Sequence, residues 1–317
     1  MITKKIARAV IRPPRAQYDE SSIPHIAEVQ GFGNVERISI AFPNSFGTLI
    51  YGSYYAAPEQ YNPKTCIIYL HGNASNQLEG RYLVSLFVPV GINVFCFDFS
   101  GCGCSPGKYV SLGYFEKNDV RSVIDLLRTD FQIQKILLWG RSMGAAVTLM
   151  TIPENRFISA AVVDSPYCSL KDLFLQIAEN EKVPKWVAKK AIKKARKAIL
   201  KTAKFDIFDV NPIESCQMIQ TPVFFIHGTD DDFVDKTNSE RLFEAIDSPN
   251  KELHLVPGKH NDDRPTKVIM DATVFLCKAV GLEIEFNDDE EEENHQEQIS
   301  QNSNQHFSNA ASLMSSL

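Results

Sequence analysis

The residues best suited to chemistry in this sequence are a serine and the two glycines that flank it. The segment ILLWGRSMGAAVTLM passes from an apolar stretch through Gly140, Ser142 and Gly144 into a second apolar stretch. A Gly-x-Ser-x-Gly sequence between a buried strand and a helix holds its serine in a strained turn with the hydroxyl exposed. Residues 135–139 have the pattern of a short strand and residues 145–152 that of a helix. We therefore predict that Ser142 is a nucleophile.

A serine hydroxyl is a weak nucleophile until a histidine accepts its proton and an acid orients that histidine. His260 is the best-placed histidine, because it follows the last predicted strand in the segment LVPGKHND. The acid is expected in the segment TDDDFVD, where Asp230, Asp231 and Asp232 follow another predicted strand. These loops should meet Ser142 at the carboxyl edge of the sheet, and any of the three aspartates could supply the acid.

The tetrahedral intermediate of acyl transfer carries a negative oxygen, which needs preorganised N–H donors. One expected donor is the backbone N–H of Met143, at the helix start beside the nucleophile. The other is the backbone N–H of Asn73 in the segment HGNAS, where Gly72 allows a close backbone approach.

These side chains need a rigid sheet to position them, and the sequence predicts one. Continuous apolar runs alternate with helical segments, which predicts a mostly parallel sheet with helices on both faces. Two earlier segments with alternating polarity, 35–42 and 48–57, are expected to be strands joined by the turn PNSFG. The later predicted strands are residues 66–70, 92–99, 135–139, 158–165, 221–228 and 251–258.

The chain is expected to contain one α/β domain between two flanking segments. Residues 1–34 form a basic N-terminal arm, residues 35–282 the domain, and residues 283–317 an acidic, Asn/Gln/Ser-rich tail expected to be disordered. The net charge is −6, but residues 283–297 alone hold nine acidic residues and no Lys or Arg. The rest of the chain is therefore slightly basic. Because no nucleic-acid motif accompanies that charge, we expect no nucleic-acid partner.

A cap insertion is expected at about 167–208, where the segment VPKWVAKKAIKKARKAILKTAKFD predicts a basic amphipathic helix. Trp186 and Leu200 fall on its polar side, among lysines that include Lys189, Lys193 and Lys197. Apolar side chains set among lysines suit peripheral contact with an anionic membrane. Two other interpretations remain open: a solvated lid, or a salt-dependent contact with the acidic tail that limits access to the site.

Cysteine usage and hydropathy indicate the compartment. Seven cysteines, an odd number, favour reduced thiols in a cytoplasmic protein. Cys102 and Cys104 have no second pair at metal-ligand spacing, so neither a metal nor a cofactor is expected. No apolar run reaches the length of a membrane span, and the N-terminus lacks the apolar core of a signal peptide.

Five ordered motifs, HGNAS, DFSGCGCSPG, GRSMG, HGTDDDFV and GKH, together resemble the α/β-hydrolase superfamily over about residues 35–280. The resemblance is to serine hydrolases described as serine aminopeptidase-like (clan SC), which include protein depalmitoylases. The chain order Ser, Asp, His is also that of their triad. The resemblance implies Ser142 as nucleophile, His260 as base and Asp231 as acid. One departure is Ser100, which stands where relatives often have an arginine.

The residues and the resemblance together predict a serine hydrolase without cofactor. The expected reaction is cleavage of a carboxylic ester or thioester through an acyl-enzyme, on a small-molecule or acylated-protein substrate. A serine peptidase of the same fold is one alternative, and a non-catalytic binding module is another. Likeness at the level of the fold does not decide among substrates.

Overall fold

The computed structural model describes residues 7–8, 10–61 and 63–285 of the 317 residues. In this part of the chain, nine strands form one sheet in the order β1-β2-β3-β5-β4-β6-β7-β8-β9. The strands are β1 Ile26–Val29, β2 Gly33–Pro43, β3 Leu49–Tyr55, β4 Thr65–Leu70, β5 Asn93–Phe97, β6 Lys135–Arg141, β7 Ile158–Asp164, β8 Val223–Gly228 and β9 Lys251–Val256.

The sheet is mostly parallel, which confirms the predicted architecture. Strands β5, β4, β6, β7, β8 and β9 pair in parallel, while β1, β2 and β3 pair antiparallel at one edge and β3 runs antiparallel to β5. The central strands are apolar throughout because both faces are covered: Ile67 and Ile68 point to opposite faces, and both are fully buried.

Helices cover both faces of the sheet. The α-helices are α2 Leu83–Phe87, α3 Glu116–Thr129, α4 Met143–Thr151, α5 Leu170–Asn180, α6 Lys185–Ala203, α7 Pro212–Cys216, α8 Thr237–Ala245 and α9 Thr266–Ala279. Helices α2 and α9 share one core cluster with Ile67 and Trp139. Helices α3, α4 and α8 share the other with Ile68 and Leu138. Each fully buried aliphatic side chain contributes roughly 1.5–3 kcal/mol to folding.

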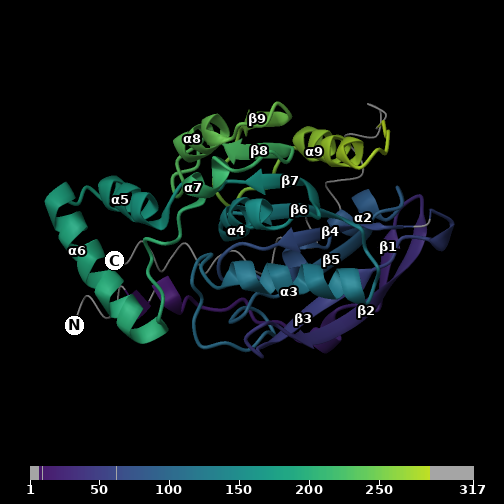
Figure 1. The fold of residues 1–317 in the computed structure, drawn as a ribbon, viewed down its shortest axis with the longest axis horizontal. Helices are drawn as coiled ribbons and strands as arrows, with labels where there is room; N and C mark the ends of the chain where they lie inside the picture. Colours follow the sequence, from purple (N-terminus) through teal and green to yellow (C-terminus); the bar gives the residue numbers. More distant parts are fainter. Residues whose placement is uncertain (1–6, 9, 62, 286–317) are drawn as a thin grey trace.

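Helices α5 and α6 occupy the range expected for the cap, between β7 and β8. Figure 1 shows them at the end of the molecule toward which β7 and β8 run. Helix α6 buries Ala188, Ala195 and Ile199 and leaves its lysines exposed. Among the described helices, none is long and apolar enough to span a membrane. From residue 286 onward, the predicted tail lies outside the described residues.

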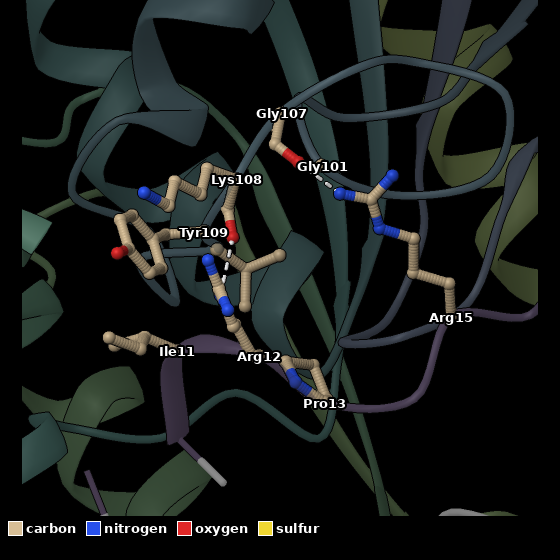
Figure 2. A pocket seen from close by; sticks show the side chains of 9 residues that line it. Ile11, Arg12, Pro13, Arg15, Gly101, Gly107, Lys108 and Tyr109 are labelled. Atoms are coloured by element: carbon tan, nitrogen blue, oxygen red, sulfur yellow. Dashed lines mark hydrogen bonds between the residues drawn. The ribbon is translucent and has the colours of Figure 1, made fainter. Parts of the chain in front are cut away.

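The N-terminal segment is more closely integrated than a separate arm ending at residue 34. Strand β1 lies within it and pairs with β2. Further upstream the chain follows the glycine-rich loop 100–110, where Val110 N–H donates to the Ile11 carbonyl at 3.0 Å. Arg12 and Arg15 donate to two carbonyls of the same loop, beside a cavity of about 350 Å³ (Figure 2). The sequence of this segment has no helix or strand periodicity, because the segment is held by backbone hydrogen bonds and by arginine side chains that donate to loop carbonyls.

Tyr18 anchors this segment to two loops near the predicted site. Its hydroxyl donates to Asp98 Oδ2 at 2.6 Å and accepts a hydrogen bond from Gln77 Nε2. Asp98 is buried, and its carboxylate also accepts from the backbone N–H groups of Gln77 and Cys104. Burial raises the pKa of Asp98 and also that of Tyr18. Asp98 therefore joins the loop after β4, the glycine-rich loop and the N-terminal segment.

We expect Tyr18→Phe to lower the free energy of unfolding by about 1–3 kcal/mol, because the buried Asp98 carboxylate loses a donor. Urea unfolding followed by circular dichroism measures the change. The exposed Tyr61 provides a matched control, since Tyr61→Phe removes the same hydroxyl and should change stability by less than about 0.5 kcal/mol. Equal effects of the two substitutions would contradict an anchoring role for Tyr18.

Candidate active site

Ser142 lies in a strained turn between β6 and α4. Its backbone has φ 52° and ψ −110°, a conformation that residues other than glycine rarely adopt and that costs on the order of 1–3 kcal/mol. The Ser142 N–H donates to the Asp164 carbonyl at the end of β7, at 2.7 Å. The first turn of α4 also holds the residue, since Ala146 N–H donates to the Ser142 carbonyl at 3.0 Å.

The two flanking glycines are required by close backbone packing. A Cβ added to Gly140 would lie 2.4 Å from the Gly144 carbonyl oxygen. A Cβ added to Gly144 would lie 1.9 Å from the Leu70 carbonyl oxygen, at the end of β4. Helix α4 can therefore begin against the ends of β4 and β6 only because both positions lack a side chain.

The structure brings Ser142, His260 and Asp231 together in one hydrogen-bonded series. Ser142 Oγ lies 2.9 Å from His260 Nε2, and His260 Nδ1 lies 2.6 Å from Asp231 Oδ2. An ionised carboxylate can only accept, so the Nδ1–H donates to it and Nε2 accepts the serine proton. The three side chains come from the segments after β6, β9 and β8, which end at the same edge of the sheet.

Asp231 is held as a buried carboxylate by four donors. Its Oδ1 accepts from the backbone N–H groups of Phe233 and Val234, and its Oδ2 from His260 and from His227 Nε2 at 3.3 Å. Burial alone would raise the pKa of Asp231, but the hydrogen bonds from His227, His260 and Val234 outweigh burial and hold it well below its ordinary value. Asp231 therefore stays ionised at neutral pH.

The neighbouring aspartates occupy different environments. Asp230 is exposed, and its carboxylate accepts from Thr229 Oγ1 and the Gly258 N–H at 3.3 and 3.4 Å. Asp232 is also exposed and lies 3.7 Å from the ammonium of Lys259. Of the three candidate acids left open by the sequence, Asp231 is the one that hydrogen-bonds to His260.

His227 contacts Asp231, a role that the sequence analysis did not assign to it. It is completely buried, with Nε2 2.7 Å from the Val234 carbonyl and Nδ1 2.6 Å from Ser239 Oγ. Because the carbonyl can only accept, Nε2 carries the proton, and it also points toward Asp231. The sequence feature that could have indicated this role is the position of His227 at the end of β8, directly before Gly228.

Arg264 joins the serine turn to the histidine loop, a role that no motif or periodic pattern predicted. Its Nε and Nη2 donate to both carboxylate oxygens of Asp164 at 2.9–3.1 Å. Its Nη1 donates to the Lys259 carbonyl at 2.9 Å, and Arg141 donates to the His260 carbonyl at 3.0 Å. Burial would raise the pKa of Asp164, but Arg264 and Arg141 lower it below its ordinary value.

The expected oxyanion donors lie at the same edge of the sheet. Met143 is the first residue of α4, and Asn73 follows β4, against whose end α4 packs. Within the described residues, neither backbone N–H donates an intramolecular hydrogen bond. Both therefore remain able to bind an anion. The neighbouring Gly72 N–H, in contrast, donates to Glu79 Oε2 at 3.2 Å.

The glycine-rich loop has no metal-ligand set. Cys102 is buried and Cys104 partly so, and no group of three or more His, Cys, Asp or Glu side chains in the described ranges could hold a metal ion. Ser100, where relatives often have an arginine, instead hydrogen-bonds to Asp119 through its backbone N–H and hydroxyl, at 2.8 and 3.0 Å.

Comparison with known proteins agrees with this architecture. A family model described as "Serine aminopeptidase, S33" matches residues 61–207 and 211–260. The chain is 29% identical to the uncharacterized protein YqkD of Bacillus subtilis over 244 residues, which cover 73% of this chain and 75% of that protein. It is also 29% identical to alpha/beta hydrolase domain-containing protein 17B of Homo sapiens over 211 residues, 63% of this chain and 62% of that protein.

Solved structures share the fold. The esterase Pf2001 of Pyrococcus furiosus superposes with a TM-score of 0.61 at 23% identity, over 77% of this chain and 93% of that chain. A puromycin hydrolase superposes with a TM-score of 0.61 at 15% identity, over 80% of this chain and 40% of that chain. With its fold and its match to the family model, the chain belongs to the α/β hydrolases of the S33 serine aminopeptidase-like family.

Proposed function

We propose that this protein is a serine hydrolase that cleaves carboxylic ester or thioester bonds through an acyl-enzyme on Ser142. The observation that carries the proposal is the hydrogen-bonded series from Ser142 Oγ through His260 to Asp231, at a strained turn. Such a series activates a hydroxyl that is otherwise unreactive at neutral pH.

In the proposed acylation, His260 Nε2 accepts the Ser142 proton while Oγ attacks the substrate carbonyl carbon. The carbonyl oxygen becomes negative and is stabilised by the backbone N–H groups of Asn73 and Met143. His260 then transfers its proton to the departing alcohol or thiol as the carbonyl bond to that group breaks. Asp231 stays ionised and stabilises the imidazolium that forms between the two transfers.

Deacylation repeats the sequence with water as nucleophile. His260 Nε2 accepts a proton from water, and the resulting hydroxide attacks the acyl carbonyl. The bond to Ser142 Oγ breaks, the serine recovers its proton from His260, and the carboxylic acid leaves. The same donors stabilise the second oxyanion, so no other group is needed.

A serine peptidase is the second candidate, because the matching family model carries an aminopeptidase description. An aminopeptidase must bind the ammonium of a peptide N-terminus, which calls for a free carboxylate near the nucleophile. The buried carboxylates beside Ser142 are already engaged, Asp164 with Arg264 and Asp231 with two histidines. This pairing favours ester or thioester cleavage, as do the esterases among the structural neighbours.

A fluorophosphonate probe tests the nucleophile. Ser142 Oγ should displace fluoride from phosphorus, with its proton passing to His260, and leave a stable phosphonyl-serine. Ser142→Ala should abolish labelling and lower hydrolysis of p-nitrophenyl esters and acyl thioesters by at least about 10³-fold. Ser75→Ala, in the loop after Asn73, is a matched control that should label normally. Labelling of Ser142→Ala would exclude Ser142, and a wild type inert to probe and substrates would indicate a binding module.

The choice of acid is tested by two adjacent substitutions. Asp231→Asn should lower kcat by about 10⁴-fold, because an amide cannot hold the Nδ1–H tautomer of His260. Asp232→Asn, one position along and exposed, should change kcat less than twofold. Steady-state kinetics on a p-nitrophenyl ester measures both. Comparable losses in the two variants would overturn the assignment of Asp231.

Arg264 is proposed as a positioning residue for His260. Arg264→Met should lower kcat about 10²-fold with little change in KM, since small displacements of a catalytic group have effects of that size. Arg264→Lys keeps the positive charge, and its kcat should lie between the kcat of Arg264→Met and that of the wild type. Arg241→Met, which breaks the exposed 3.5 Å contact with Asp172, is the control and should be neutral. A folded Arg264→Lys protein with wild-type kcat would contradict the role.

A further inference from the structure

The cap helix α6 presents one continuous face to solvent. Because successive residues of an α-helix are rotated by about 100°, seven side chains fall within an arc of about 120°. They are Trp186, Lys189, Lys190, Lys193, Lys197, Leu200 and Lys201. All seven are exposed. We call this set the outer face of α6; it lies opposite the buried Ala195 and spans about 21 Å between Trp186 and Leu200.

The lysines of the outer face have no acidic partner among the described residues. The helix contains no Asp or Glu, and within the described ranges its one ion pair joins Arg196, beside the outer face, to Asp206 at 2.5 Å. Lysine ammonium groups are charged at neutral pH. Five lysine charges without an acidic partner in the described part of the chain make a concentrated positive surface along one helix face, which is complementary to an anionic partner.

Two apolar side chains at the ends of the outer face indicate which anionic partner. Trp186 is 73% exposed and Leu200 is 46% exposed, whereas most large apolar side chains of the described residues are buried. A soluble polyanion would contact the lysines and leave both side chains in water. A lipid surface accepts the ammonium groups at the headgroups and the two apolar side chains just beneath them.

We propose that the outer face of α6 binds the surface of an anionic lipid membrane. Figure 1 shows α6 at the outer end of the molecule, and the seven side chains of its outer face are exposed. The helix belongs to the cap over the edge of the sheet that carries Ser142. Binding therefore holds that edge near the membrane. Lipid binding itself does not rest on the proposed hydrolase activity, but its use in bringing acylated substrates to Ser142 does.

The two tryptophans of the chain supply a direct test with the full-length protein. Trp139 is buried and serves as an internal reference, whereas Trp186 should shift its emission to shorter wavelength when it enters the headgroup region. We expect this shift with vesicles of phosphatidylcholine and phosphatidylserine, and none with phosphatidylcholine alone. An ionic strength of about 1 M, where the Debye length is about 3 Å, should weaken binding at least tenfold.

Matched variants separate the charge from the apolar contacts in a vesicle co-sedimentation assay. Each lysine near an anionic surface contributes about fivefold to the affinity, so K193Q/K197Q should weaken binding about 25-fold. K267Q/K278Q removes two exposed lysines from α9 instead and should change it less than twofold. Trp186→Ser should weaken binding at least tenfold, whereas Met218→Ser, at a residue 64% exposed elsewhere, should not.

Three results would overturn the proposal. They are equal binding to neutral and anionic vesicles, unchanged affinity of K193Q/K197Q, and unchanged affinity of Trp186→Ser. The last result, with charge dependence retained, would point to a soluble polyanion. Hydrolysis of a soluble p-nitrophenyl ester by each variant reports on the proposed function separately, since none of these residues belongs to the proposed catalytic groups.

Discussion

The buried ion pair between Asp164 and Arg264 is the interaction on which the geometry of the candidate site depends. The backbone carbonyl of Asp164 accepts a hydrogen bond from the Ser142 N–H and so holds the serine turn. Arg264 donates to the Lys259 carbonyl and so holds the loop of His260. Removing two charges from water is costly, and a buried pair adds little to stability unless its hydrogen bonds are complete. Here both carboxylate oxygens are engaged. The pair therefore selects one relative placement of two loops more than it stabilises the fold.

The strain at Ser142 can persist because the sheet and α4 determine its position from both sides. A positive φ at a serine costs on the order of 1–3 kcal/mol, which the turn cannot recover locally. The compensation comes from the fully buried residues of β6 and α4, and from glycines that allow α4 to approach β4. The same close approach leaves the Met143 N–H at the edge of the sheet. One packing constraint thus accounts for both the exposed hydroxyl and the orientation of an anion donor.

The sequence was sufficient to predict the parallel sheet and the residues that meet at its edge. Continuous apolar runs identify strands buried on both faces, and parallel strands end at one edge by topology alone. The residue pattern alone could not choose among Asp230, Asp231 and Asp232, because that choice depends on which carboxylate turns inward to His260 and His227; the family resemblance implied Asp231, which is the one that contacts His260. It also missed β1 and Arg264. Neither carries a periodic pattern, since β1 is a short edge strand and Arg264 acts through carbonyls of a loop.

The candidate site and the outer face of α6 illustrate opposite treatments of charge. At the site, every buried charge has a partner: Asp164 pairs with Arg264, and Asp231 accepts four hydrogen bonds. Complete pairing keeps the site rigid in the absence of any partner. On α6 the lysines lack counter-charges within the described chain, so they contribute a favourable electrostatic interaction only when an anionic surface binds to them. A helix that can hold its fold through Ala195 and Ile199 on the inner side is free to carry that unpaired charge outside. The candidate site at the sheet edge is therefore fixed by paired charges, whereas the cap helix beside it carries positive charges that have no acidic partner among the described residues.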